Sequence, residues 1–231
     1  MMKHQHAEEE GEHWLPVSDM MSGLMVIFLF IAITYMLQVS EDRNQLVEIA
    51  VTYEKTKIAI YDELQIEFKD DLKKWNAEID KQSLAFRFQE PDVLFSVGEA
   101  EIKDKFKVIL DDFFPRYISI LKQYQPDIEE IRIEGHTSSE WSKNSAADDK
   151  TYFLNMALSQ NRTRATLEYC LMLPNIANER LWIKQILTAN GLSSSKPILV
   201  NGVEDTVHSR RVEFKVKTNS ETQILKILQR K

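Results

Sequence analysis

One uncharged, apolar run near the N-terminus constrains this chain more than any other feature. Residues Met20–Leu37 carry no charge, and only a few small or hydroxylated side chains interrupt their apolar character. A helix needs about 20 mostly apolar residues to cross a bilayer, and Val17–Gln38 supplies them. The run is too long for the apolar region of a signal peptide, and no small-residue cleavage site follows it. The sequence therefore predicts an uncleaved transmembrane helix over residues 14–38.

One carboxylate, Asp19, lies at the start of this run, and two interpretations of it are open. In the first, Asp19 caps the helix N-terminus, where a carboxylate accepts backbone N–H groups and stays ionised. In the second, Asp19 lies in hydrocarbon, where the cost of its charge makes it a reversible proton carrier. Its position alone favours the cap.

Three further residues share a helical face with Asp19. Ser22, Gly23 and Val26 follow it by three, four and seven residues, which is the spacing of one side of an α-helix. Small side chains at such a face let a second helix approach closely. We therefore expect these residues to face a pore or a second copy of the helix.

The charges that flank the span mark its orientation only weakly. Lys3 is the one fixed positive charge before it, and the leader is otherwise acidic. A short tail is easily retained in the cytoplasm, whereas the long segment after the span must lie on the other side. We expect an inner-membrane protein with residues 1–13 in the cytoplasm and the C-terminal part in the periplasm.

Composition excludes several classes of function. The 231 residues have a formal net charge of −7, which argues against nucleic acid as a partner because phosphate binding needs a basic surface. No CxxC, HExxH, Walker loop or GxSxG motif occurs, so we expect no enzyme. The lone Cys170 excludes an intrachain disulfide and is interpreted as a small core residue, with an intermolecular bridge as the alternative.

Residues 40–82 contain neither Gly nor Pro, and they are predicted to form one long helix. Apolar residues recur along it at a spacing of three to four: Leu46, Ile49, Tyr53, Ile60, Leu64, Phe68, Trp75 and Ile79. This seam could pack on the chain's own domain, but the length and the polar opposite face favour a partner helix. We expect a dimerising stalk over residues 39–82.

The rest of the chain alternates between strand and helix patterns. Strands are predicted at 84–88, 128–135, 197–200 and 211–217, and helices at 102–124, 155–173 and 178–190. Pro115 is expected to bend or break the first of these helices. The sequence therefore predicts an α+β domain over residues 83–218, a sheet covered by helices on one side, followed by a tail over 219–231.

Four short motifs in this domain carry a family resemblance. FSVGEAEI (95–102), IEGHTSS (133–139), NMALSQNR (155–162) and SRRVEF (209–214) resemble the successive motifs of the OmpA-like peptidoglycan-binding domain. The segment SDMMSGLMVIFLF around Asp19 resembles the single transmembrane helix of the MotB family of stator subunits. The acidic leader and long stalk make the chain more similar to the MotB-like subunits of Zorya anti-phage defence systems than to flagellar ones.

The resemblance implies a βαβαββ sandwich and an ion-driven motor. Asp19 would carry the transported ion, H⁺ in preference to Na⁺, and no cofactor is expected. Two copies of this chain would lie inside a ring of a MotA-like, here ZorA-like, multi-span subunit, with the C-terminal domain bound to peptidoglycan. The alternatives are a flagellar stator subunit, a subunit of the ExbD or TolR type, and a passive OmpA-like tether without motor activity.

The resemblance also implies a site for a peptidoglycan stem peptide. Arg162 ends the family's LSxxR motif, where an arginine binds a stem-peptide carboxylate, and Asn155 and Leu158 precede it on nearly the same helical face. Thr137 and Ser138 follow the second strand. The family usually has an aspartate at the position of Ser138, where it pairs with the stem-peptide amine.

Other polar residues in the domain are given simpler interpretations. The segment 139–154 supplies Glu140, Asp148 and Asp149, which could replace the missing aspartate but are better explained as a solvated acidic insertion. His136 lacks neighbours at ligand spacing, so it is interpreted as structural and no metal site is expected. Arg164 is expected to be a surface charge, and one of Arg210 and Arg211, which start the last strand, is expected to pair with an acidic surface group instead of a ligand.

Overall fold

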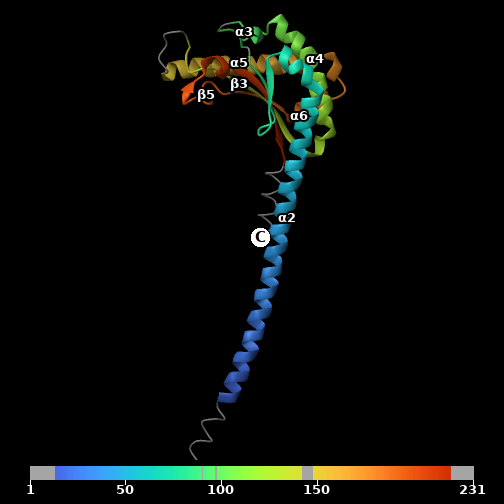
Figure 1. The fold of residues 1–231 in the computed structure, drawn as a ribbon, viewed down its shortest axis with the longest axis vertical. Helices are drawn as coiled ribbons and strands as arrows, with labels where there is room; N and C mark the ends of the chain where they lie inside the picture. Colours follow the sequence, from blue (N-terminus) through green and yellow to red (C-terminus); the bar gives the residue numbers. More distant parts are fainter. Residues whose placement is uncertain (1–13, 90, 97, 142–147, 220–231) are drawn as a thin grey trace, which may run out of the picture. The chain divides into compact units, whose positions relative to one another are not determined.

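The computed structural model describes residues 14–89, 91–96, 98–141 and 148–219 (Figure 1). The chain divides into two compact units, Met1–Val51 with Ile224–Lys231, and Thr52–Gln223. Predictions for the leader 1–13, and for the tail after Asn219, lie outside the described residues.

Helix α2, Trp14–Lys74, is continuous over 61 residues. Its N-terminal part is apolar, with a mean hydropathy of 2.3 in the most apolar window and none of that window buried. Among the described residues, this is the one helix long and apolar enough to cross a membrane. The apolar N-terminal helix of the predicted fold is therefore confirmed.

The prediction that this helix continues to Gln82 is wrong. It ends at Lys74, and Asn76 adopts the left-handed backbone conformation with φ of 45°. Strand β1, Ala77–Asp80, then pairs antiparallel with β2, Ala85–Phe88. The Asp80 carboxylate accepts hydrogen bonds from the backbone N and the Oγ of Ser83, at 2.7 and 2.8 Å, and so closes the hairpin.

The interpretation of the apolar seam is also wrong over its C-terminal half. Ile60, Leu64 and Phe68 are fully buried in the core of the second unit. The centre of the Phe68 ring lies 5.2 Å from the ring centre of Phe86 on β2 and 5.4 Å from the ring centre of Phe113. A spacing of four marks a buried face but does not identify what covers it, and here the cover is the chain's own domain. The dimerising role of the remaining seam stays a prediction, and the side chain of Tyr53 lies outside the description.

The second unit contains a five-stranded sheet in the order β1-β2-β7-β3-β4. Strand β7, Arg211–Thr218, pairs antiparallel with β2 and with β3, Ile128–His136. Strand β4, Leu187–Gly191, pairs parallel with β3. A small separate hairpin joins β5, Leu199–Val200, to β6, Val203–Glu204.

The helices of this unit lie mainly where they were predicted, with three differences. Their bounds are α3, Pro91–Leu94; α4, Asp104–Gln123; η1, Gln125–Asp127; α5, Asp149–Met172; η2, Pro174–Ile176; α6, Arg180–Ile186; and α7, Thr206–Ser209. Helix α4 continues through Pro115, so the expected break is absent. Helix α5 starts six residues before Asn155, and the last four residues of the helix predicted over 178–190 belong to strand β4.

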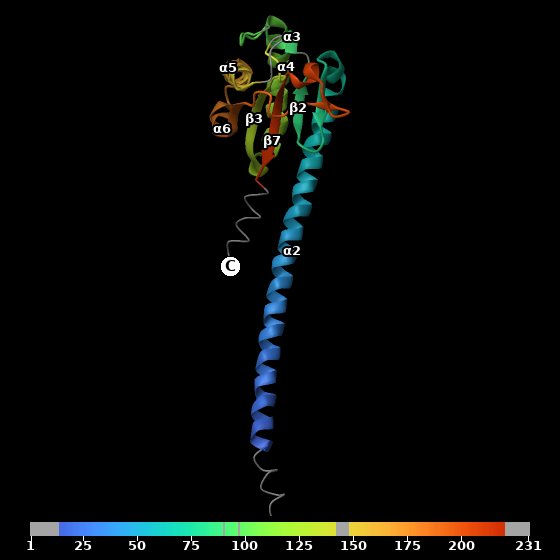
Figure 2. The same cartoon turned by 90° about the vertical axis from the view of Figure 1, so that its left-hand side faces the viewer.

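Helices α4 and α5 pack on the same face of the sheet, as the fold prediction required (Figures 1 and 2). The ring centre of Phe113 on α4 lies 4.5 Å from the ring centre of Phe86 and 5.1 Å from that of Phe214. Helix α5 approaches at Gly135, where an added Cβ would lie 2.7 Å from the γ-methyl group of Thr163. The predicted α+β class, a sheet covered by helices on one side, is confirmed.

Candidate functional site

Asp19 is the sixth residue of α2, so it does not cap the helix. Asp19 is exposed in the described chain, as are Ser22, Gly23 and Val26. The helix is regular here, and the Ser22 hydroxyl donates to the Ser18 carbonyl oxygen at 2.8 Å. The structure therefore places the four predicted residues on one exposed face of the helix. The first of them, Asp19, lies about one and a half turns after the start of the helix.

Arg162 lies on the buried face of α5, with 9% of its surface exposed. Its Nε donates to the carbonyl oxygen of Glu99 at 2.8 Å, and Nη2 donates to that of Ser96 at 3.1 Å. The guanidinium also lies 4.9 Å from the ring centre of Phe95. Arg162 thus ties α5 to the loop that carries the first family-like motif.

A small cavity adjoins Arg162 at the end of the sheet where β3 finishes and β7 begins. It is lined by Leu94, Phe95, Gly135, His136, Ser159, Arg162, Arg211 and Val212. These residues include no carboxylate and two arginines, of which Arg211 is paired with Glu213. Arg211 and His136 were missed as lining residues because their place here depends on the pairing of β3 with β7.

Ser138 and Asn155 are in direct contact. The Asn155 side chain donates to the Ser138 carbonyl oxygen at 3.1 Å, and both residues are buried. Thr137 is buried as well, and its hydroxyl oxygen has no hydrogen-bond partner among the described residues. Leu158 is half-buried on α5, and Ser159, rather than Leu158 or Asn155, lines the cavity.

The acidic residues considered as substitutes for the missing aspartate have different surroundings. Asp148 caps α5, and its carboxylate accepts the backbone N–H of Thr151 at 2.8 Å. Glu140 and Asp149 are exposed. A carboxylate that the sequence did not suggest contacts the residue next to Ser138. Glu204 of β6 accepts a hydrogen bond from the backbone N–H of Ser139 at 3.0 Å and another from the Ser139 hydroxyl.

A row of charged groups crosses the other face of the sheet. Arg211 is 7% exposed and donates from Nε to Glu213 Oε1 at 2.6 Å, and Arg87 donates to the same oxygen at 2.7 Å. Of the two arginines that start β7, Arg211 therefore pairs with an acidic group as expected, but that group, Glu213, is buried and not at the surface. Arg164, by contrast, is exposed and pairs with Glu168, as predicted.

A curated relative decides the family. The chain is 52% identical over 223 residues to the Zorya protein ZorB of Escherichia coli, covering 96% of this chain and 94% of that protein. The chain belongs to the ZorB family. No protein-family model matches it. The Zorya family membership expected from the leader, stalk and motifs is therefore confirmed.

Two solved bacterial structures are similar in fold to this ZorB-family chain. A MotB-like protein from Desulfovibrio vulgaris is 23% identical, with 71% of this chain and 91% of that chain covered and a TM-score of 0.49. The cell wall anchor of the type VI secretion system from Pseudomonas aeruginosa is 21% identical, with coverage of 67% and 96% and a TM-score of 0.46.

Proposed function

We propose that this chain is the MotB-like subunit of an ion-driven inner-membrane motor in a Zorya anti-phage defence system. The observation that carries the proposal is the 52% identity to ZorB over nearly the whole chain. Proton movement through Asp19 would drive rotation of a ZorA-like ring around two copies of α2. The C-terminal unit would hold the pair to peptidoglycan, and the chain would act as a motor subunit and not as a catalyst.

The setting of Asp19 supports its role as the proton carrier. It lies inside the apolar helix, and an ionisable side chain within a membrane span usually belongs to an ion path. Each proton that crosses the membrane releases about 2.3 kcal/mol per 100 mV of potential. Gly23 leaves open space beside the helix, since a Cβ there would meet nothing within 4 Å, so a second copy could approach closely.

The continuity of α2 supports the transmission of force. The helix that carries Asp19 runs without interruption to Lys74, and its last turns are buried in the core of the second unit. A helix that is packed into a folded domain resists rotation about its own axis. With that domain held by the cell wall, the ring would turn and the two helices would not.

The cavity beside Arg162 supports peptidoglycan as the anchor. Arg162 lines it, and an arginine suits the free carboxylate of a stem peptide. Ser138 cannot form an ion pair with the stem-peptide amine, and Glu204 is the carboxylate that binds the neighbouring Ser139. We propose that Glu204 supplies the negative charge that the family usually obtains from an aspartate.

A phage plaque assay tests this function, with the partner genes expressed intact. Asp19→Asn should abolish protection, and Arg162→Ala should weaken it strongly, at unchanged levels of the protein in membranes. Each variant has a matched control. Ser18→Asn places the amide of Asp19→Asn one position away, and Arg164→Ala removes an exposed arginine from α5, the helix that also carries Arg162. Full protection by Asp19→Asn would instead support a passive tether.

A further inference from the structure

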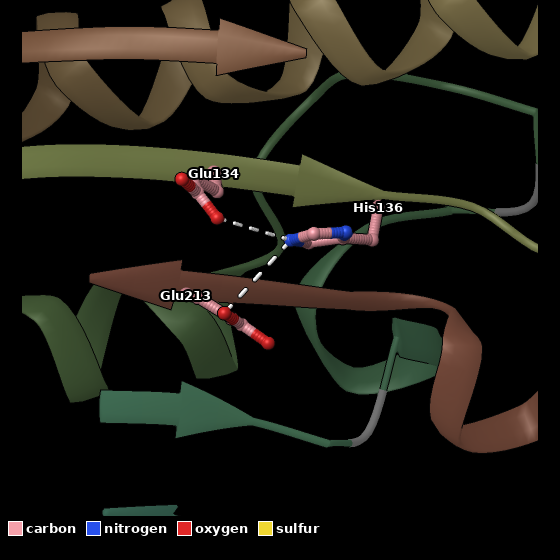
Figure 3. A group of neighbouring side chains, drawn as sticks. All are labelled: Glu134, His136 and Glu213. Atoms are coloured by element: carbon pink, nitrogen blue, oxygen red, sulfur yellow. Dashed lines mark ion pairs between the residues drawn. The ribbon is translucent and has the colours of Figure 1, made fainter. Parts of the chain in front are cut away.

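Three buried side chains converge near the centre of the charged face of the sheet. Glu134 and His136 lie two residues apart on β3, so they point to the same side, and Glu213 lies opposite Glu134 on β7. Each is less than 5% exposed. One ligand atom from each lies within 4.8 Å of the other two. Figure 3 shows both carboxylates directed at the same edge of the imidazole ring.

The distances in this group are too long for hydrogen bonds. His136 Nε2 lies 3.6 Å from Glu134 Oε2 and 3.9 Å from Glu213 Oε2. Neither ring nitrogen of His136 has a hydrogen-bond partner among the residues that the structure describes. A buried imidazole without a hydrogen-bond partner is uncommon. A further atom, bound between the three side chains, would explain why His136 has none.

The same distances fit a shared metal ion. Zn²⁺ binds imidazole nitrogen and carboxylate oxygen at about 2.0 to 2.2 Å. Two such ligand atoms are on the order of 3.4 to 4 Å apart when the angle at the metal is tetrahedral or somewhat wider. Both distances from His136 Nε2 lie in this interval.

The surrounding arginines leave the required oxygens available. Arg211 and Arg87 both donate to Oε1 of Glu213, so its Oε2 is the oxygen turned toward His136. Arg132 contacts Oε1 of Glu134 at 3.4 Å, and Oε2 again faces His136. Hydrogen bonds of this kind to the outer oxygens orient carboxylate ligands in metal sites.

We propose that Glu134, His136 and Glu213 bind a divalent transition-metal ion of the Zn²⁺ type. One imidazole and two carboxylates favour such an ion over Ca²⁺ or Mg²⁺, which prefer oxygen alone. The ion bridges β3 and β7, and a water molecule completes its coordination. Because His136 also lines the cavity beside Arg162, the ion fixes one wall of that cavity.

Metal binding to the full chain in lipid nanodiscs tests the site. The leader contains other histidines, so His4, His6 and His13 are first changed to Ala in every sample. The protein is stripped with a chelator, titrated with ZnCl₂, and its zinc content is measured after gel filtration. Co²⁺ in place of Zn²⁺ reports coordination directly through its visible absorption bands.

We expect one zinc ion per chain and a loss of at least about ten-fold in affinity in Glu134→Gln and Glu213→Gln. These substitutions keep the side-chain shape, and circular dichroism checks that they fold. His208→Ala is the matched control, since His208 pairs with Asp205 alone in an exposed position. The reference protein carries only the three leader substitutions. Failure of this reference to bind zinc, or equal zinc affinity in the reference, Glu134→Gln and Glu213→Gln, would overturn the proposal.

Discussion

Arg116 of α4 and Glu67 of α2 are joined twice. Arg116 Nε donates to Glu67 Oε1 at 2.7 Å, and its Nη2 donates to the Glu67 carbonyl oxygen at 2.8 Å. Nη1 reaches Asp71 and Asp112 at 3.0 Å each, and the guanidinium lies 4.6 Å from the ring centre of Phe68. One side chain therefore fixes the last turns of α2 to α4.

Removing this side chain should loosen the C-terminal unit. We expect Arg116→Ala to lower the free energy of unfolding by about 2 kcal/mol, because it leaves several carboxylates and a carbonyl without their donor. Urea unfolding of the detergent-solubilised chain measures the change. Arg164→Ala, which breaks only an exposed pair, should cost less than about 0.5 kcal/mol. Equal effects of the two variants would contradict this role for Arg116.

Acid should weaken the same connection. Burial would raise the pKa of Asp71, but hydrogen bonds from Lys74 and Arg116 outweigh it and lower that pKa below its ordinary value. A lowered folded-state pKa stabilises the fold above the unfolded value, and this contribution is lost as the pH falls through the folded value. Between about pH 6 and about pH 3, the Tm of wild type should therefore fall further than that of Asp71→Asn. Parallel curves would show that Asp71 contributes nothing.

A single methyl group should disturb the contact between α5 and the sheet. In Gly135→Ala the new Cβ would lie 2.7 Å from Thr163 Cγ2 and 2.9 Å from the Ser159 carbonyl oxygen. We expect a loss of about 1 to 3 kcal/mol in the free energy of unfolding. Adding Thr163→Ser removes the methyl group at 2.7 Å and should restore part of the loss. A double variant no more stable than the single one would contradict this packing.

The single cysteine should be inert in the folded chain. Cys170 is completely buried, and burial raises the pKa of its thiol well above the ordinary value. Maleimide should therefore label it only in denaturant, and non-reducing gels should show no disulfide-linked dimer. Rapid labelling of the native chain would favour the alternative of an intermolecular bridge.

Much of the fold follows from local pattern, and the exceptions have a common cause. Strands β2 and β7 have a large apolar residue at every second position (Phe86 and Phe88; Val212, Phe214 and Val216), and this pattern is sufficient to predict them. Strands β1 and β4 alternate as well, in AEID and LTANG, but each run is short and follows closely on a helical pattern, so the sequence predicts a continued helix there. Their conformation comes from pairing with β2 and β3, which a local reading cannot detect.

The sequence likewise predicts one part of the candidate site and not the other. The motif that ends at Arg162 indicated a residue that does line a cavity. The neighbours of Arg162 there, His136 and Arg211, come from the antiparallel pairing of β3 with β7. Cross-strand register depends on the whole sheet, so sequence spacing alone could not place His136 and Arg211 beside Arg162.

Peptidoglycan binding should depend on Arg162 more than on its exposed neighbour. In a pull-down with purified sacculi, Arg162→Ala should reduce binding by about ten-fold or more, because a charge-assisted pair with a carboxylate is lost. Arg164→Ala should bind as wild type does. Arg162 also holds the Ser96 and Glu99 carbonyl oxygens, so thermal unfolding is compared in parallel. Wild-type binding by a folded Arg162→Ala would exclude this cavity as the anchor site.

The central claim is that Asp19 carries protons, and proton flux tests it most directly. The chain and its multi-span partner are co-reconstituted in lipid vesicles that contain a pH-sensitive dye, and a membrane potential is imposed. Wild type and Ser18→Asn should acidify the vesicle lumen at the same rate, whereas Asp19→Asn should fall to the rate of vesicles without protein. Acidification by the Asp19→Asn complex at the wild-type rate would contradict the account.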